Sequence, residues 1–378
     1  MPDRVEQLLQ KYNIEDIENQ SETLDKLCPV ARVNPGFSPS RIAAAAFEAP
    51  HALLKDRMIW ECLACGLCGE ISGADMSRFI RDVREVAYSQ GVSGARTHGG
   101  AFLSIQRIGA DPANKPDRKS WIDKQLKVAQ KRGKYLFWVG NAPFFDALMP
   151  ELSPMSIESV RSAVLLLNRL GVSPVVMEDE RSSGHDLLWI GDKESFLRLA
   201  EQNLAAVRDT GARTVIVSSP EDYYTLARSY PEYFGDIDFK VIHITEFIAK
   251  RLDRLQFREY RRRVVYHDPC RLGRGMGVYD APREILRAVP GLELFEMRNA
   301  RERSLCCGTS CWINCGKYSK LMQASRLQEA VDVGAEALLT ACWECAIHFR
   351  CTTRPQAWQQ VSIDIEDLIH LAVSLLEE

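Results

Sequence analysis

The sequence has no cysteine between residues 69 and 269, although its 378 residues include 12 cysteines. It also lacks a long apolar run, because stretches such as Ala163–Leu167 are far too short to cross a bilayer. Neither sign of charge is in excess, since 48 Lys and Arg residues stand against 51 Asp and Glu residues, a formal net charge of −3. The first residues, Met1–Arg4, contain no apolar stretch of the secretory kind.

Each of these absences excludes a class of protein. The balanced charge argues against a nucleic-acid-binding protein, and the short apolar runs argue against a membrane-spanning one. We therefore expect a cytoplasmic, soluble protein that meets a membrane only peripherally, through partners. Disulfide bonds are not expected in that reducing compartment. The sequence also offers no nucleotide-binding fingerprint and no hydrolytic motif, so the cysteines are the best indication of its chemistry.

The cysteines that are present form two groups near the two ends of the chain. They stand at positions 28, 62, 65 and 68, and at positions 270, 306, 307, 311, 315, 342, 345 and 351. A chain of this length does not need disulfides as staples, so such bunching is typical of metal or redox sites.

The two ends also differ in predicted secondary structure. Residues before about 95 show helical periodicity, as in the Ala-rich Pro39–Glu48 and the amphipathic Ser77–Ser89, and no strand pattern. From Tyr135 onward, short apolar runs alternate with helical segments, which is typical of α/β layers with a parallel sheet. A weak internal repeat relates Val241–Ile248 to Ser362–Ile369.

These patterns predict an α+β protein. An all-helical domain would occupy residues 1–95, followed by a linker or surface connector over residues 96–129. Two α/β half-domains related by the repeat would then occupy residues 130–258 and 259–378.

The first cysteine group has the spacing Cys62-x-x-Cys65-x-x-Cys68. Three thiolates at this spacing suit one face of a cubane [4Fe–4S] cluster, and the Cys28-Pro29 pair supplies a fourth ligand, as in bacterial ferredoxins. The ligands of a second cubane are missing together, so one cubane is predicted. A zinc site remains the alternative, because Cys₄ zinc sites also use Cys-x-x-Cys pairs.

The second group comprises Cys270, the adjacent pair Cys306-Cys307 before a glycine, and Cys342-x-x-Cys345. Adjacent cysteines fit poorly into a simple tetrahedral site but suit a larger cluster whose irons share a thiolate. The predicted strands before Cys270 and Cys342 end at these cysteines. Because α/β sheets place their sites at the carboxyl ends of parallel strands, we expect the two segments to meet there.

The spacing Cys-x₃₅-Cys-Cys-Gly-x₃₃-Cys-x-x-Cys resembles the cysteine-rich CCG domain of heterodisulfide reductase subunits of the B type. The segment Cys62–Cys68 with Cys28–Ala31 resembles the small ferredoxin-type subunit of the same enzymes, so the chain is similar to a fusion of the two. The resemblance implies a non-cubane [4Fe–4S] cluster beside the cubane. The implied ligands of the non-cubane cluster are Cys270, Cys306, Cys307, Cys342 and Cys345, and those of the cubane are Cys28, Cys62, Cys65 and Cys68.

An upstream copy of the CCG motif is degenerate. Asn141, Ser182, Ser183, Ser219 and Asp222 stand at the positions that match cysteine ligands in family members with two motifs. The first half-domain is therefore predicted to be a structural copy without a cluster.

Three cysteines, Cys311, Cys315 and Cys351, lie outside both patterns. A redox-active thiol pair is one interpretation, and we favour the other, that they pack as small buried residues. His267 stands beside a predicted ligand and is a candidate proton donor to a substrate sulfur. A structural hydrogen bond to the backbone is an equally good interpretation of this histidine.

The resemblance implies an oxidoreductase of the thiol/disulfide class that acts as an iron–sulfur subunit of a heterodisulfide reductase-like complex. Electrons would pass from the cubane to the non-cubane cluster, where the five cysteines and His267 would act on a thiol, a disulfide or a sulfane sulfur. The expected partners are a flavin-containing subunit, a small thiol or sulfur carrier, and a quinone-reactive membrane subunit, but no nucleic acid. Two alternatives remain: an electron relay between a flavin dehydrogenase and quinone, and a structural zinc ion in the CCG site.

Overall fold

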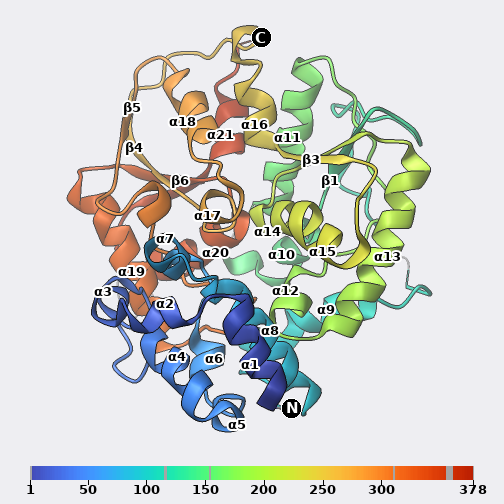
Figure 1. The fold of residues 1–378 in the computed structure, drawn as a ribbon. Helices are drawn as coiled ribbons and strands as arrows, with labels where there is room; N and C mark the ends of the chain where they lie inside the picture. Colours follow the sequence, from blue (N-terminus) through green and yellow to red (C-terminus); the bar gives the residue numbers. More distant parts are fainter. Residues whose placement is uncertain (1, 115–116, 153–154, 310, 355–360, 378) are drawn as a thin grey trace.

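The computed structural model describes residues 2–114, 117–152, 155–309, 311–354 and 361–377. A helical N-terminal part lies across one end of two α/β units, each built on its own parallel sheet (Figure 1). The predicted mixed α/β architecture with parallel sheets is confirmed.

The N-terminal part is helical because its apolar residues recur on one face of each short helix. In α4 (Pro39–Glu48), Ser38 accepts a hydrogen bond from the Arg41 N–H and Pro39 occupies the first turn, both favourable at a helix start. The helix then buries Ile42 and Ala46. The other helices are α1 (Pro2–Lys11), α2 (Glu15–Glu18), α3 (Ser21–Leu27), α5 (Pro50–Leu53), α6 (Met58–Glu61), α7 (Leu67–Ser72) and α8 (Met76–Ser89).

The first α/β unit has a parallel sheet in the order β1-β2-β3, and Val175 bridges to the free side of β1. Its strands are nearly continuous apolar runs, as expected for strands covered on both faces. Its elements are β1 (Tyr135–Trp138), α10 (Ala142–Leu148), η2 (Pro150–Leu152), α11 (Ser156–Arg169), α12 (His185–Trp189), α13 (Lys193–Thr210), β2 (Thr214–Val217), α14 (Pro220–Tyr224), the π-helical turn η3 (Thr225–Ser229), α15 (Tyr230–Phe234), β3 (Lys240–His243), α16 (Ile244–Ala249) and η4 (Leu252–Arg254).

The second unit has a parallel sheet in the order β5-β4-β6-β7, so its central pair β4-β6 corresponds in place to β1-β2. The two units pack through helices, α11 on α21 and α16 on α18. Its elements are β4 (Arg262–His267), α17 (Gly273–Met276), α18 (Asp280–Arg287), β5 (Leu292–Phe295), η5 (Arg301–Arg303), α19 (Lys317–Asp332), β6 (Ala337–Thr340), α20 (Trp343–Thr353), β7 (Asp364–Asp367) and α21 (Leu368–Ser374).

The segment 96–129 is not the surface connector that its Gly- and Pro-rich flanks suggested. It contains η1 (Thr97–Gly100) and α9 (Ala101–Gly109), which buries Phe102 and Leu103. Phe102 stacks on Trp312 of the second unit with ring centroids 4.2 Å apart. The apolar face of this short helix therefore belongs to the core between the units.

The last strand, unlike the others of this sheet, is rich in acidic residues. The structure has β7 at Asp364–Asp367, because its acidic side chains are used at the sheet edge. Arg262 of β4 forms ion pairs with Asp364 and Glu366. Asp367 then caps α21 by accepting from the His370 N–H at 2.8 Å.

A buried ion pair fixes the chain at the carboxyl end of β1. Arg118 and Glu180 are 1% and 0% exposed, and their Nη2 and Oε1 atoms are 2.7 Å apart. Glu180 also accepts from the backbone N–H groups of Val139 and Gly140, at 3.0 and 2.8 Å. The two side chains and the two backbone N–H groups are shielded from water. Removal of either Arg118 or Glu180 would therefore leave the other as an uncompensated buried charge.

We predict that Glu180→Ala lowers the free energy of unfolding by about 3–5 kcal/mol, because Arg118 would be left as a buried unpaired charge. Urea denaturation followed by circular dichroism under anaerobic conditions measures this. The control is Glu194→Ala, which removes an exposed ion pair to Arg198 and should change stability little. Equal effects of the two substitutions would contradict the argument.

Candidate iron–sulfur sites

The cysteines of the first group line one cavity in the helical part. Cys28 follows α3, Cys62 follows α6, and Cys68 lies in α7. Cys65 lies in the turn before α7, where Gly66 has a φ of 79°. Apart from the four sulfurs the walls are mainly apolar, with Leu24, Phe37, Leu63 and Ile71 among them.

Cys28 is buried, and the other three cysteines of this group are partly buried. Burial raises the pKa of Cys62 to about 11 and holds the pKa values of Cys28 and Cys68 well above their usual range. The cysteines are close enough for each negative charge to disfavour the next. Thiols with such raised pKa values become thiolates together only when a cation binds them, which is the linkage expected at a metal site.

A second observation that bears on a metal site is the presence of arginines without acidic partners near these cysteines. Arg84 is fully buried and donates to the carbonyl oxygens of Ile59, Cys62 and Trp189 at 2.8, 2.6 and 3.0 Å. Arg274 donates from Nε to the Cys65 carbonyl at 2.8 Å. Neither forms an ion pair within the part of the chain that the structure describes.

Arg271, which follows Cys270, donates to the Ala64 carbonyl at 3.0 Å and lies 3.7 Å from the ring centroid of Trp189. A buried unpaired cation is costly. An iron–sulfur cluster with thiolate ligands is an anion, so a cluster among these cysteines would compensate the arginines. The residues therefore fit the cubane predicted from the spacing.

The second group of cysteines meets at the carboxyl ends of β4 and β6, as the strand pattern predicted. Cys270 lies in the turn after β4, Cys342 follows β6 and caps α20, and the Cys306-Cys307 pair enters from the loop after η5. The sulfurs of Cys270 and Cys306 are 3.9 Å apart, and those of Cys307 and Cys345 are 3.2 Å apart. The Cys342 sulfur accepts from the Cys345 N–H at 3.3 Å.

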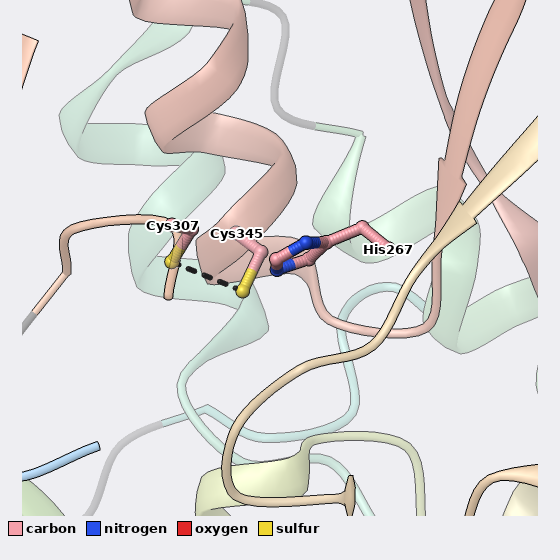
Figure 2. Close-up of side chains that lie close together, drawn as sticks. All are labelled: His267, Cys307 and Cys345. Carbon is pink, nitrogen blue, oxygen red and sulfur yellow. Dashed lines mark hydrogen bonds between the residues drawn. The ribbon is translucent and has the colours of Figure 1, made fainter. Parts of the chain in front are cut away.

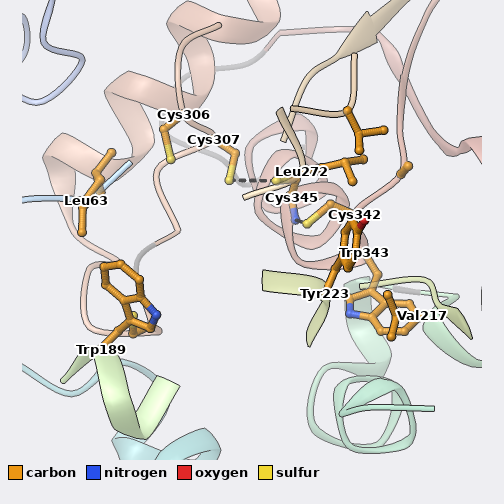
Figure 3. Close-up of a cluster of buried hydrophobic side chains, with 14 of the residues drawn as sticks. Leu63, Trp189, Val217, Tyr223, Leu272, Cys306, Cys307, Cys342, Trp343 and Cys345 are labelled. Carbon is orange, nitrogen blue, oxygen red and sulfur yellow. Dashed lines mark hydrogen bonds between the residues drawn. The ribbon is translucent and has the colours of Figure 1, made fainter. Parts of the chain in front are cut away.

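Figure 3 shows four of these cysteines inside a buried apolar cluster with Leu272 and Trp343. Hydrogen bonding from Cys306 lowers the pKa of Cys270 to about 6, and burial raises the pKa of Cys342 to about 12. Hydrogen bonds from Cys306 and Cys345 hold the pKa of Cys307 well below its usual range. The thiols thus share protons, and the N-terminus of α20 points positive charge at them. This donor set suits several cations bridged by thiolates.

His267 is oriented at this site by Arg326. The Arg326 Nε donates to His267 Nδ1 at 3.2 Å, so a neutral ring carries its hydrogen on Nε2. The ligand atoms of His267, Cys307 and Cys345 lie within 4.8 Å of one another (Figure 2). Burial lowers the pKa of His267, which favours a neutral ring, and its buried Nε2 has no hydrogen-bond partner among the described residues.

At three of the five positions of the degenerate motif, the side chain makes a hydrogen bond to the nearby backbone. Ser219 caps α14 by accepting from the Asp222 N–H at 3.2 Å, and Ser182 accepts from the Gly184 N–H at 3.3 Å. Ser183 accepts from the His185 N–H at 3.4 Å. Asn141 stands before α10. The three serine hydroxyls therefore stabilise turns and a helix start.

The structure adds Glu221 to the second site, which the sequence did not single out. Its Oε2 lies 3.6 Å from the Cys342 sulfur, although it belongs to the first α/β unit. Burial raises the pKa of Glu221 to about 8. The sequence could have singled out Glu221, because this residue stands between Ser219 and Asp222 in the degenerate motif. The unassigned cysteines differ among themselves: Cys311 is buried as expected, but Cys351 is only partly buried and Cys315 is exposed.

Comparison with known proteins agrees with this arrangement. A family model described as "Cysteine-rich domain", CCG, matches residues 152–227 and 264–350. The chain is 27% identical over 354 residues to a dihydromethanophenazine:CoB–CoM heterodisulfide reductase component of Methanosarcina acetivorans, covering 90% of this chain and 82% of that protein. The chain is a heterodisulfide reductase-like iron–sulfur protein.

This heterodisulfide reductase-like protein is also 28% identical over 334 residues to FadF of Bacillus subtilis, named a probable iron-sulfur-binding oxidoreductase. The match covers 82% of the chain but 46% of FadF, so the chain spans less than half the length of that relative. A hypothetical protein from Helicobacter pylori shares the fold, with a TM-score of 0.61 and 13% identity over 97% of this chain and 73% of that one. Within the described ranges, no helix has the length and apolar character needed to cross a membrane.

We predict that Arg274→Gln lowers the reduction potential of the first site, because a nearby positive charge favours the reduced, more negative cluster. One charge at an effective dielectric constant of about 20 contributes on the order of 2–3 kcal/mol, or on the order of 100 mV for one electron. A redox titration monitored by EPR measures the shift. Arg274→Lys, which keeps the charge, should shift the potential much less, and equal shifts for both would contradict the electrostatic argument.

Proposed function

We propose that this chain is an electron-transfer and catalytic subunit of a heterodisulfide reductase-like complex. A cubane [4Fe–4S] cluster would be held by Cys28, Cys62, Cys65 and Cys68, and a non-cubane one by Cys270, Cys306, Cys307, Cys342 and Cys345. The substrate would be a thiol, a disulfide or a sulfane-sulfur compound. The observation that carries the proposal is the meeting of five cysteines from three distant segments beside the helical part.

When bound, the clusters would supply one-electron transfer and an iron site for a substrate sulfur. Reduction of a disulfide consumes two electrons and two protons and releases two thiols. The chain supports this chemistry with a short connection between its sites, because Arg274 donates both to the Cys65 carbonyl and to the Ser304 carbonyl, at 2.8 and 2.6 Å. Ser304 lies two residues before Cys306.

A cavity of about 420 Å³ reaches a cysteine of each site, Cys65 and Cys270. Four arginines line it, Arg78, Arg228, Arg271 and Arg274, together with the carboxylates of Glu70, Asp75 and Glu232. Asp75 pairs with Arg78 and Glu232 pairs with Arg81. The guanidinium groups of Arg228, Arg271 and Arg274 therefore outnumber the remaining carboxylate and favour a substrate that carries an anionic group. We propose this cavity as the entry for substrate, with Cys270 as the first ligand that it meets.

Two side chains are placed to handle protons or orient sulfur. His267 would donate its Nε2–H to a sulfur beside Cys307 and Cys345, because Arg326 fixes the tautomer. Glu221 lies across the site next to Cys342. His267 is fully buried and Glu221 is partly buried, so either side chain could pass a proton to a sulfur at this site.

The first α/β unit, residues 130–258, would be a copy of the second, residues 259–378, that has lost its cluster. The shared strand order and the two CCG matches support this. Residues 1–95 would form the ferredoxin-type domain. We propose that partner subunits deliver the electrons, a flavin-containing one first, and that a quinone-reactive subunit connects the complex peripherally to a membrane.

We predict that Cys307→Ala removes about half of the iron and the signal of the non-cubane cluster, while the cubane signal remains. The matched control is Cys315→Ala, since Cys315 is exposed and belongs to neither ligand set. Iron quantitation and EPR of the anaerobically purified full chain measure both effects. Loss of both signals together, or of neither, would contradict the assignment of Cys307.

The same preparation tests the substrate class. After oxidation in the presence of a small thiol that bears a carboxylate, a paramagnetic signal that depends on the thiol is expected. Cys307→Ala should abolish this signal. If the iron content is complete and no thiol changes the spectrum, the chain is instead an electron relay between a flavin dehydrogenase and quinone.

A further inference from the structure

A second set of metal-binding side chains lies outside both cysteine groups. His185, Asp186 and Cys311 are 6%, 2% and 6% exposed, and one ligand atom of each lies within 4.8 Å of the other two. His185 and Asp186 begin α12 in the first α/β unit, directly after the degenerate motif. Cys311 comes from the second unit, four residues beyond Cys307.

The loop that carries Cys311 crosses from the second unit to the other parts of the chain. The Thr97 N–H donates to the Trp312 carbonyl at 3.1 Å, and Asn314 donates from Nδ2 to the Trp60 carbonyl at 3.0 Å. Cys311 and Trp312 have positive φ angles of 47° and 54°, which residues other than glycine rarely adopt. The surrounding structure therefore holds this loop firmly in place.

Neighbouring side chains orient two members of the set. The His185 Nδ1 and the Thr225 hydroxyl are 2.8 Å apart, which leaves Nε2 for a ligand. Gln106 donates from Nε2 to the Asp186 Oδ2 at 2.5 Å. Metal-binding histidines and carboxylates usually have such outer partners, which fix the ring and the carboxylate.

We propose that His185, Asp186 and Cys311 bind a zinc ion that is separate from both iron–sulfur sites. Their nitrogen, oxygen and sulfur donors together suit Zn²⁺, a borderline-soft cation that accepts all three. A thiolate and a carboxylate balance the two charges of the ion, so the bound set is neutral in a buried place. None of the three residues is a predicted cluster ligand or stands at a degenerate ligand position.

The role of this zinc ion is structural. It joins α12 of the first unit to the loop that follows Cys306 and Cys307. It therefore fixes the loop that brings these two cysteines to the second cluster site. This explains why α12 retains a histidine and an aspartate at a motif that has lost all of its cysteines.

The test is a metal analysis of the full chain, purified anaerobically with its iron–sulfur clusters. We expect one equivalent of zinc in addition to the iron. X-ray absorption at the zinc edge should show one sulfur neighbour at about 2.3 Å and nitrogen or oxygen neighbours at about 2.0–2.2 Å. An absence of zinc, or zinc with four sulfur neighbours, would overturn the proposal, because four sulfurs would place the ion among the cluster cysteines.

Variants of the proposed ligands test the zinc site independently. His185→Gln and Cys311→Ser should each lower the zinc content at least tenfold after dialysis against a chelator. The matched controls are His243→Gln and Cys351→Ser: His243 is also fully buried, with its Nδ1 2.8 Å from the Thr245 hydroxyl. Control variants should keep their zinc, and zinc retained by His185→Gln would overturn the proposal. If a variant does not fold, the zinc-edge X-ray absorption spectrum of the unmodified chain still tests the proposal.

Discussion

The structure depends on three arginines, Arg84, Arg271 and Arg274, that form no ion pair among the described residues and lie where three parts of the chain meet. Arg84 binds carbonyl groups of the helical part and of α12, while Arg271 and Arg274 extend from the second α/β unit to the turn that carries Cys65. Such cations are costly to bury unless an anion compensates them. In the proposed function, the cysteines around them would supply that anion by binding an iron–sulfur cluster, and this would link folding, metal binding and the contact between the parts.

The two α/β units use one architecture for different purposes. In each, the two central strands are parallel, so their carboxyl ends share one edge of the sheet. At that edge the second unit presents thiols, whereas the first presents serine hydroxyls that cap α14 and stabilise turns. Glu221 extends from the first unit to Cys342 of the second. The first unit thus contributes to the environment of the second site without any of the thiols that its own motif would require.

Much of this arrangement was predictable because it follows from local rules. The apolar run of the strand Thr214–Val217 and the capped, Ala-rich helix Pro39–Glu48 each favour one type of secondary structure. The acidic strand β7 and the buried helix α9 were not predictable in this way. An edge strand whose acidic side chains pair with Arg262 does not need an apolar face. The apolar face of α9 is buried because it packs against Trp312, which is far away in sequence.

By itself, the sequence indicated the chemistry: the number and spacing of the cysteines predicted two groups of candidate iron ligands and one stretch, between residues 69 and 269, without any thiol. The tertiary structure alone decided which distant side chains share a space. It placed Arg84 and Arg274 beside the first cysteines, Glu221 and His267 at the second, and His185 and Asp186 next to Cys311. The reason is physical, since spacing along a chain constrains ligands within one turn or loop, whereas electrostatic compensation depends on distances that exist only once the parts have packed.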